Sequence, residues 1–149
     1  RVLAPIVRPL LDTLTKIWDL IRNTILRTIN WVKNIFNKIM DYFAAMSAFG
    51  AMEFLRADRE QREVMLNAAQ IARLEGISLS DVAGAAANTP AGRLMALLRQ
   101  AGIRGEIAGS GLEVSGTPNA QQRNVLSRRV AELRSAEESS LNSNATGAN

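Results

Sequence analysis

Two residue types that supply much of protein chemistry are missing, because the 149-residue chain contains no cysteine and no histidine. Without cysteine, the chain can form neither a disulfide framework nor a thiolate metal site. Without histidine, it lacks the side chain that most often acts as an acid or base at neutral pH and that most often binds metals. These absences exclude the commonest kinds of hydrolytic and metal-dependent site.

The remaining polar residues form no catalytic pattern. The serines lie in no nucleophile elbow, and no histidine is present to activate them. The segment GEIAGSG, residues 105–111, lacks the spacing and the lysine of a phosphate-binding loop. Glu137 and Glu138 are adjacent and therefore do not share a helix face. We expect no enzymatic activity, no cofactor and no metal site.

Long uncharged segments are also lacking. None is longer than 11 residues, the length of Tyr42 to Met52, whereas a transmembrane helix needs about 20. The opening residues carry charges throughout and are followed by no small-residue cleavage site, so they do not resemble a signal peptide. We therefore expect neither a transmembrane helix nor a signal peptide. Because the chain begins at Arg1 and not at methionine, we expect a processed product or a piece of a longer polypeptide.

The net charge of +4 is unevenly distributed along the chain. Residues 1–48 hold seven basic and three acidic side chains, 7 − 3 = +4, and include every lysine. The rest of the chain holds eleven of each sign and every glutamate. This shift predicts a boundary near Phe49 and Gly50. We expect a basic helical segment at 1–48, a small domain at 49–138 and a polar flexible tail at 139–149.

Residues 10–46 separate into two faces when successive residues are turned by the 100° of an α-helix. Charged residues and asparagines occupy one face, and large apolar residues occupy the other, with Leu26 as the clear exception. The apolar stripe consists of Leu14, Ile17, Trp18, Ile21, Ile25, Ile29, Val32, Ile35, Phe36 and Ile39. The basic face consists of Lys16, Arg22, Arg27, Lys33 and Lys38. The pattern predicts one long amphipathic helix, which begins after Pro5 and Pro9 because proline is tolerated only in the first turn of a helix.

The width and period of the apolar stripe indicate what could cover it. The apolar side spans about 180° and keeps a period of 3.6, so it is broader than the seam of a two-stranded coiled coil. A multi-helix bundle, a neighbouring protein or a membrane interface would fit it. We predict that the stripe packs against protein, with a membrane surface as the alternative. Ile17, Ile21, Ile25, Val32, Ile35 and Ile39 should then be buried, and Arg22, Asn30, Lys33 and Asn37 should be exposed or face a polar lumen.

The second part of the chain predicts a small helical domain with a β-hairpin. Residues 50–76 should form a helix that ends at Gly76. A short helix should follow Ser78 or Ser80 and run to Ala87, and Thr89-Pro90 should start another that runs to Gly102. Residues 104–116 should form a hairpin with turn glycines after Ile107. Thr117-Pro118 should open a last helix with four inward-facing residues, Val125, Leu126, Val130 and Leu133. The fold class is mainly α.

Residues 78–98 loosely resemble a helix-turn-helix, and the hairpin after them could be a wing. However, residues 77–116 carry three arginines and three carboxylates, 3 − 3 = 0. Binding to a nucleic-acid duplex normally requires an excess of positive charge, because neutralisation of phosphates supplies most of the affinity. We therefore do not expect specific reading of nucleic acid, and a winged-helix-like module remains the third alternative.

The segment LLDTLTKIWDLIRNTILRTINWVKNIFNKIMDYF, residues 10–43, resembles the amphipathic tryptophan- and isoleucine-rich repeats of tape-measure proteins and internal ejection proteins of tailed bacteriophages. The resemblance implies a chain held in several copies inside a virion and released toward the host envelope. We expect a non-enzymatic structural protein that forms homo-oligomers or binds other assembly subunits. The leading alternative is a membrane-surface or envelope-penetrating protein that binds anionic lipid.

Overall fold

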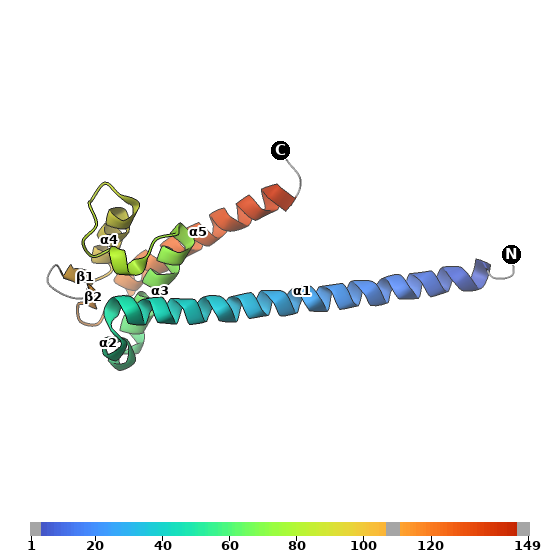
Figure 1. The fold of residues 1–149 in the computed structure, drawn as a ribbon, viewed down its shortest axis with the longest axis horizontal. Coiled ribbons are helices and arrows are strands. Elements are labelled where there is room, and N and C mark those ends of the chain that lie inside the picture. Colours follow the sequence, from blue (N-terminus) through green and yellow to red (C-terminus); the bar gives the residue numbers. More distant parts are fainter. Residues whose placement is uncertain (1–3, 107–110, 146–149) are drawn as a thin grey trace. The chain divides into compact units, whose positions relative to one another are not determined.

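A computed structural model describes residues 4–106 and 111–145 of the chain (Figure 1). It confirms the predicted class, with one long N-terminal helix, several shorter helices and a two-stranded antiparallel hairpin. The chain divides into two compact units, one ending at Ile39 and one beginning at Met40. The elements are α1 (Ala4–Phe49), α2 (Ala51–Arg56), α3 (Arg59–Glu75), η1 (Leu79–Asp81), α4 (Pro90–Gln100), β1 (Ile103–Glu106), β2 (Gly111–Val114) and α5 (Ala120–Ala145).

Helix α1 is longer at both ends than its sequence pattern predicts. It begins at Ala4 and therefore contains Pro9. Proline at this position removes only one backbone hydrogen bond, close to the helix end where amide groups already lack partners. At the other end, Gly50 has a φ of 96° and its amide donates to the carbonyl of Met46 at 3.0 Å. Glycine adopts this backbone conformation without the strain that a side chain would add.

The helix predicted over residues 50–76 is in fact two helices, α2 and α3, separated at Ala57 and Asp58. The Asp58 carboxylate accepts a hydrogen bond from the Gln61 amide at 2.8 Å, and the Gln61 side chain accepts one from the Asp58 amide at 3.0 Å. This capping box satisfies two amide groups that have no partner inside the helix. The local signal that could have predicted it is an aspartate followed three residues later by a glutamine. Gly76, with a φ of 70°, ends α3 where predicted.

The helix predicted from Ser78 or Ser80 to Ala87 is wrong, since only the short 3₁₀ turn η1 forms there. The Ser78 side chain makes no capping hydrogen bond, and Leu79 and Val82 are buried in the core. Anchoring by these two side chains replaces a regular helix. Helix α4 begins where predicted, with the Thr89 hydroxyl accepting a hydrogen bond from the Gly92 amide at 3.1 Å.

The predicted hairpin is formed by β1 and β2, with Ile103 opposite Val114 and Gly105 opposite Leu112. Ile107 and the turn lie outside the described residues. Helix α5 starts with a second capping box, between Asn119 and Gln122, and continues to Ala145 through much of the predicted polar tail. Of the four residues predicted to face inward, Leu126 and Val130 are buried and Val125 and Leu133 are half-buried.

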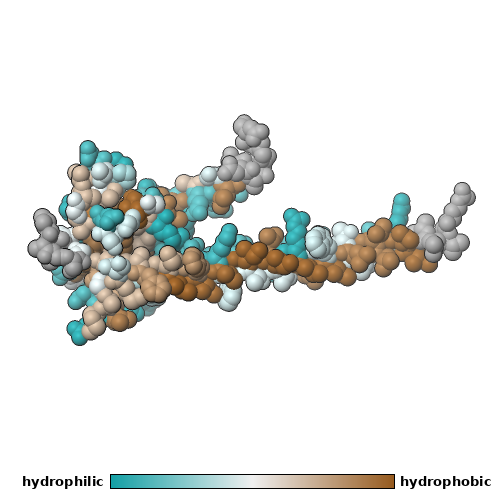
Figure 2. Space-filling view, in the orientation of Figure 1, coloured by the Kyte–Doolittle hydropathy of each residue, from teal (hydrophilic) through white to brown (hydrophobic). Residues whose placement is uncertain are grey.

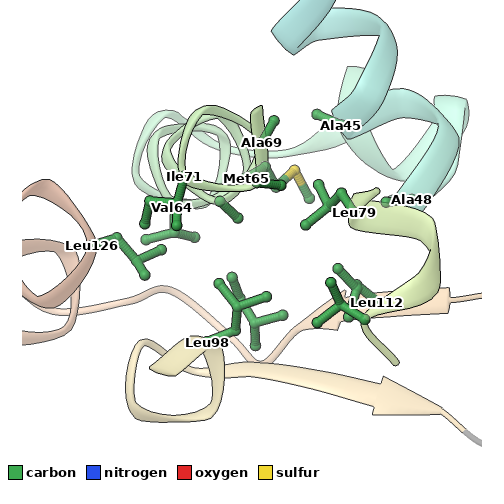
Figure 3. Close-up of a cluster of buried hydrophobic side chains, with 14 of the residues drawn as sticks. Ala45, Ala48, Val64, Met65, Ala69, Ile71, Leu79, Leu98, Leu112 and Leu126 are labelled. Carbon is green, nitrogen blue, oxygen red and sulfur yellow. The ribbon is translucent and has the colours of Figure 1, made fainter. Parts of the chain in front are cut away.

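The core of the second unit is arranged around α3. Side chains from α3, α4 and α5 point toward one another, among them Val64, Ile71, Leu98 and Leu126 (Figure 3). The end of α1 also contributes, because Ala45, Ala48 and Phe49 are buried there. An ion pair joins α1 to α3, with Asp41 Oδ1 2.9 Å from Arg73 Nε. Asp41 is the only polar or charged residue that is buried among those the structure describes.

Candidate functional site

The apolar stripe of α1 is the candidate functional site. Its ten side chains are 38–63% exposed, and every residue from Pro5 to Phe36 is exposed. Figure 2 shows hydrophobic residues continuing along α1. The predicted burial of Ile17, Ile21, Ile25, Val32, Ile35 and Ile39 is therefore wrong for the single chain, where they are 38–52% exposed.

Most of the residues predicted to be exposed on the opposite side of α1 are exposed in the structure. Arg22, Asn30 and Lys33 are exposed, and Asn37 is half-buried. Leu20 and Trp31, two large apolar residues outside the predicted stripe, are 68% and 64% exposed. Their place on the helical wheel, at the edge of the stripe, could have identified them. The exposed apolar surface is therefore wider than the predicted stripe.

Threonines on α1 do not interrupt its apolar side. The hydroxyls of Thr13, Thr24 and Thr28 each donate a hydrogen bond to the backbone carbonyl four residues earlier, at 2.8–2.9 Å. Such back-bonding satisfies the hydroxyl within the helix. On the helical wheel these three residues lie among the apolar side chains. They present methyl groups there without hydroxyls in need of a partner.

All five side chains of the basic face are exposed. Within the described residues, no ion pair joins any of them to a carboxylate, whereas Asp41 at the end of α1 is paired with Arg73. The only carboxylates on the part of α1 that precedes Asp41 belong to Asp12 and Asp19. The face therefore presents cationic charge that can interact with an anionic partner.

A hollow of about 460 Å³ in the second unit is lined by Leu94 and Leu97 of α4, together with charged residues. There Arg129 Nη2 lies 2.8 Å from Glu75 Oε1. This hydrogen bond raises the pKa of Arg129 above its ordinary value, so the guanidinium stays charged at any pH at which proteins fold. The carboxylate and the guanidinium therefore neutralise each other, and Arg93 is the other charged residue of the lining.

A second hollow, of about 350 Å³, lies between the end of α1, α3 and η1. Its lining is mostly apolar and includes the hydroxyls of Ser47 and Ser80, whose oxygens are 3.4 Å apart. Neither hydroxyl can be activated by histidine, because the chain contains none. Among the described residues, no three acidic side chains come together as possible metal ligands.

None of the described helices is both long enough and apolar enough to cross a membrane. No protein-family model, no curated protein and no solved structure matches the chain. The function of the chain is therefore inferred from the geometry and charge of α1.

Proposed function

We propose that this chain is a non-enzymatic structural protein of a multi-copy assembly, with the apolar stripe of α1 as its contact surface. The observation that carries the proposal is the exposure of ten large apolar side chains along one side of one helix. Complete burial of such a side chain is worth about 1.5–3 kcal/mol. Covering the half that is exposed on all ten would contribute on the order of 10 kcal/mol. A surface of this kind supports binding to another molecule.

The resemblance of residues 10–43 to tape-measure and ejection proteins of tailed bacteriophages supports one kind of assembly. In that setting several copies of α1 would lie side by side inside the virion, with their apolar stripes together and their basic faces toward a polar lumen. The second unit, which has its own core and capped helices, would form a folded end to each copy.

The winged-helix alternative receives less support from the contacts of the hairpin. Arg104 on β1 lies opposite Glu113 on β2, and their side chains approach to 4.0 Å. A cation paired across the hairpin contributes less to phosphate binding than an unpaired one. The basic face of α1, in contrast, favours an anionic surface as a second partner of the same helix.

Replacing Ile25 with aspartate tests the proposed contact surface. Ile25 is 52% exposed in the middle of the stripe, and assembly would bury the new carboxylate without a partner, at a cost of several kcal/mol. We expect the full wild-type chain to sediment as an oligomer and the Ile25→Asp chain to shift toward the monomer. Analytical ultracentrifugation over a range of protein concentrations measures both.

The matched control places the same carboxylate on the opposite face of the helix. Asn30 is exposed there, and asparagine and aspartate have similar helix propensities. Asn30→Asp should leave the oligomer close to wild type. Equal losses from the two substitutions, or a wild-type chain that stays monomeric at every concentration, would contradict the proposal.

A further inference from the structure

The cations of the basic face lie at the two edges of the polar side of α1. At 100° per residue, Lys16, Arg27 and Lys38 fall at about 160–200° on the helical wheel. Arg22 and Lys33 fall at about 40–60°, next to the apolar stripe. On the other side Lys38 falls at nearly the same angle of the helical wheel as the exposed residues Leu20 and Trp31, which extend the stripe to about 200–220°. Both margins of the apolar surface are therefore basic.

The centre of the polar side carries the opposite charge. Asp12 and Asp19 fall at about 100–120°, midway between the two basic edges, and Asn30 and Asn37 lie along the same line. Lysine and arginine at the margin can lay their aliphatic stems along an apolar surface while their charged ends remain in water. Carboxylates at the centre are held as far as possible from that surface. This distribution suits a helix that lies in an interface with its carboxylates facing water.

An eleven-residue repeat keeps these edges straight along the helix. Lys16, Arg27 and Lys38 are separated by eleven residues, as are Arg22 and Lys33. Eleven residues are close to three helical turns, about 3.67 residues per turn. Equivalent side chains therefore recur in line, and the basic edges wind only slowly around α1. A nearly straight margin is what a helix needs in order to lie along a surface over many turns.

The charge at the margins distinguishes between the partners that could cover the stripe. When two helices pair along an apolar seam, the residues that flank the seam face each other, and opposite charges there favour pairing. Two copies of α1 would bring basic edge against basic edge in a parallel or an antiparallel arrangement. An anionic lipid surface instead offers negative headgroups to both edges and an apolar interior to the stripe. The charge at the margins thus opposes pairing of two copies and favours lipid, whereas burial of the apolar stripe favours either partner.

The tryptophans are also placed for an interface. Trp18 and Trp31 are 63% and 64% exposed, and both lie nearer to the margins of the apolar side than to its centre. Tryptophan is enriched where hydrocarbon meets headgroups, because one end of the ring system is apolar and the other can donate a hydrogen bond.

We propose that α1 binds an anionic lipid surface, with its apolar stripe in the interface and the two basic edges among the headgroups. This proposal rests on the proposed function in one respect, because both use α1 as the element that binds a partner. The lipid acts as a second partner for the stripe when other copies do not cover it.

Vesicle binding by the full chain tests the inference with a reporter that the sequence already contains. Trp18 and Trp31 are the only tryptophans, so tryptophan fluorescence reports on α1 alone. With vesicles that contain phosphatidylglycerol at low salt, we expect a blue shift of tryptophan emission and flotation of the protein with the vesicles. Binding should weaken as salt is raised and should be much weaker on pure phosphatidylcholine. An unchanged emission spectrum and no flotation at low salt would overturn the inference.

A triple variant tests the importance of one basic edge. Lys16→Gln, Arg27→Gln and Lys38→Gln together remove three cations and keep good helix formers. A basic residue near an anionic membrane contributes roughly a fivefold gain in partitioning, so the triple variant should bind on the order of a hundredfold more weakly.

The control lowers the net charge by the same three units at the centre of the polar side, through Asn23→Asp, Asn30→Asp and Asn37→Asp. It should lose much less affinity than the edge variant, because these positions point away from the headgroups. Equal losses would show that net charge alone matters and would overturn the assignment of the edges. A chain that self-associates but ignores anionic vesicles would refute the lipid inference alone. A monomer that binds vesicles would refute only the proposed multi-copy assembly.

Discussion

Gly92, in the first turn of α4, occupies a position with no space for a side chain. A Cβ atom there would overlap the backbone carbonyl of Ala86, and the Gly92 amide also donates to the capping hydroxyl of Thr89. Neither group can move without disrupting the start of the helix. Gly92→Ala should therefore lower the free energy of unfolding by about 3 kcal/mol or more, as overpacking against rigid atoms does. Urea unfolding followed by circular dichroism measures the change.

Gly84 provides the matched control for this substitution. A Cβ atom at Gly84 would meet no other atom within 4 Å, and its φ lies outside the left-handed region. Gly84→Ala should change the free energy of unfolding by no more than about 0.5 kcal/mol, or stabilise slightly by restricting the unfolded chain. A similar loss from both glycines would contradict the steric explanation at Gly92.

At the scale of elements, the start of α3 depends on Asp58. Its carboxylate caps the helix through the Gln61 amide and also accepts a hydrogen bond from the Thr117 hydroxyl at 3.0 Å, which connects α3 to the segment before α5. Asp58→Ala should lower the free energy of unfolding by about 1 kcal/mol, the usual value for loss of an N-terminal cap. Thermal or urea denaturation of the full chain would detect it.

Asparagine at the same position separates capping from charge. Asparagine caps helices about as well as aspartate, so Asp58→Asn should retain most of the stability that Asp58→Ala loses. If the two variants were equally destabilised, the negative charge near the helix dipole would explain the effect in place of the capping hydrogen bond.

At the scale of the whole molecule, its net charge of +4 resides in residues 1–48. The binding of α1 to other copies and its binding to anionic lipid should therefore change in opposite directions when salt is raised. Self-association brings like-charged edges together, so raising the salt concentration should screen their repulsion and strengthen the oligomer. Binding to anionic vesicles should weaken over the same range. Parallel sedimentation and vesicle-flotation titrations would measure both trends. An oligomer that dissociates as salt rises would contradict the charge arrangement inferred for the edges.

The features that the sequence predicted correctly depend on local signals. The amphipathic course of α1 follows from the spacing of large apolar residues, which repeats at the helical period over many turns. Gly76 ends α3 and Thr89-Pro90 opens α4, because the glycine, the threonine hydroxyl and the proline act on the backbone beside them. The hairpin follows in the same way from its short apolar segments and intervening glycines. Each signal acts within a few residues.

The features that only the tertiary structure decided involve residues far apart in the chain. Residues 78–87 contain plausible helix signals, yet the burial of Leu79 and Val82 in the core decides their conformation. Asp41 is buried against Arg73, 32 residues away, and the Thr117 hydroxyl donates a hydrogen bond to the Asp58 carboxylate, 59 residues away. The amphipathic pattern of α1 likewise predicted an apolar face but not whether this chain covers it. Burial depends on which segments meet in space, and a helical period records only which side chains share a face.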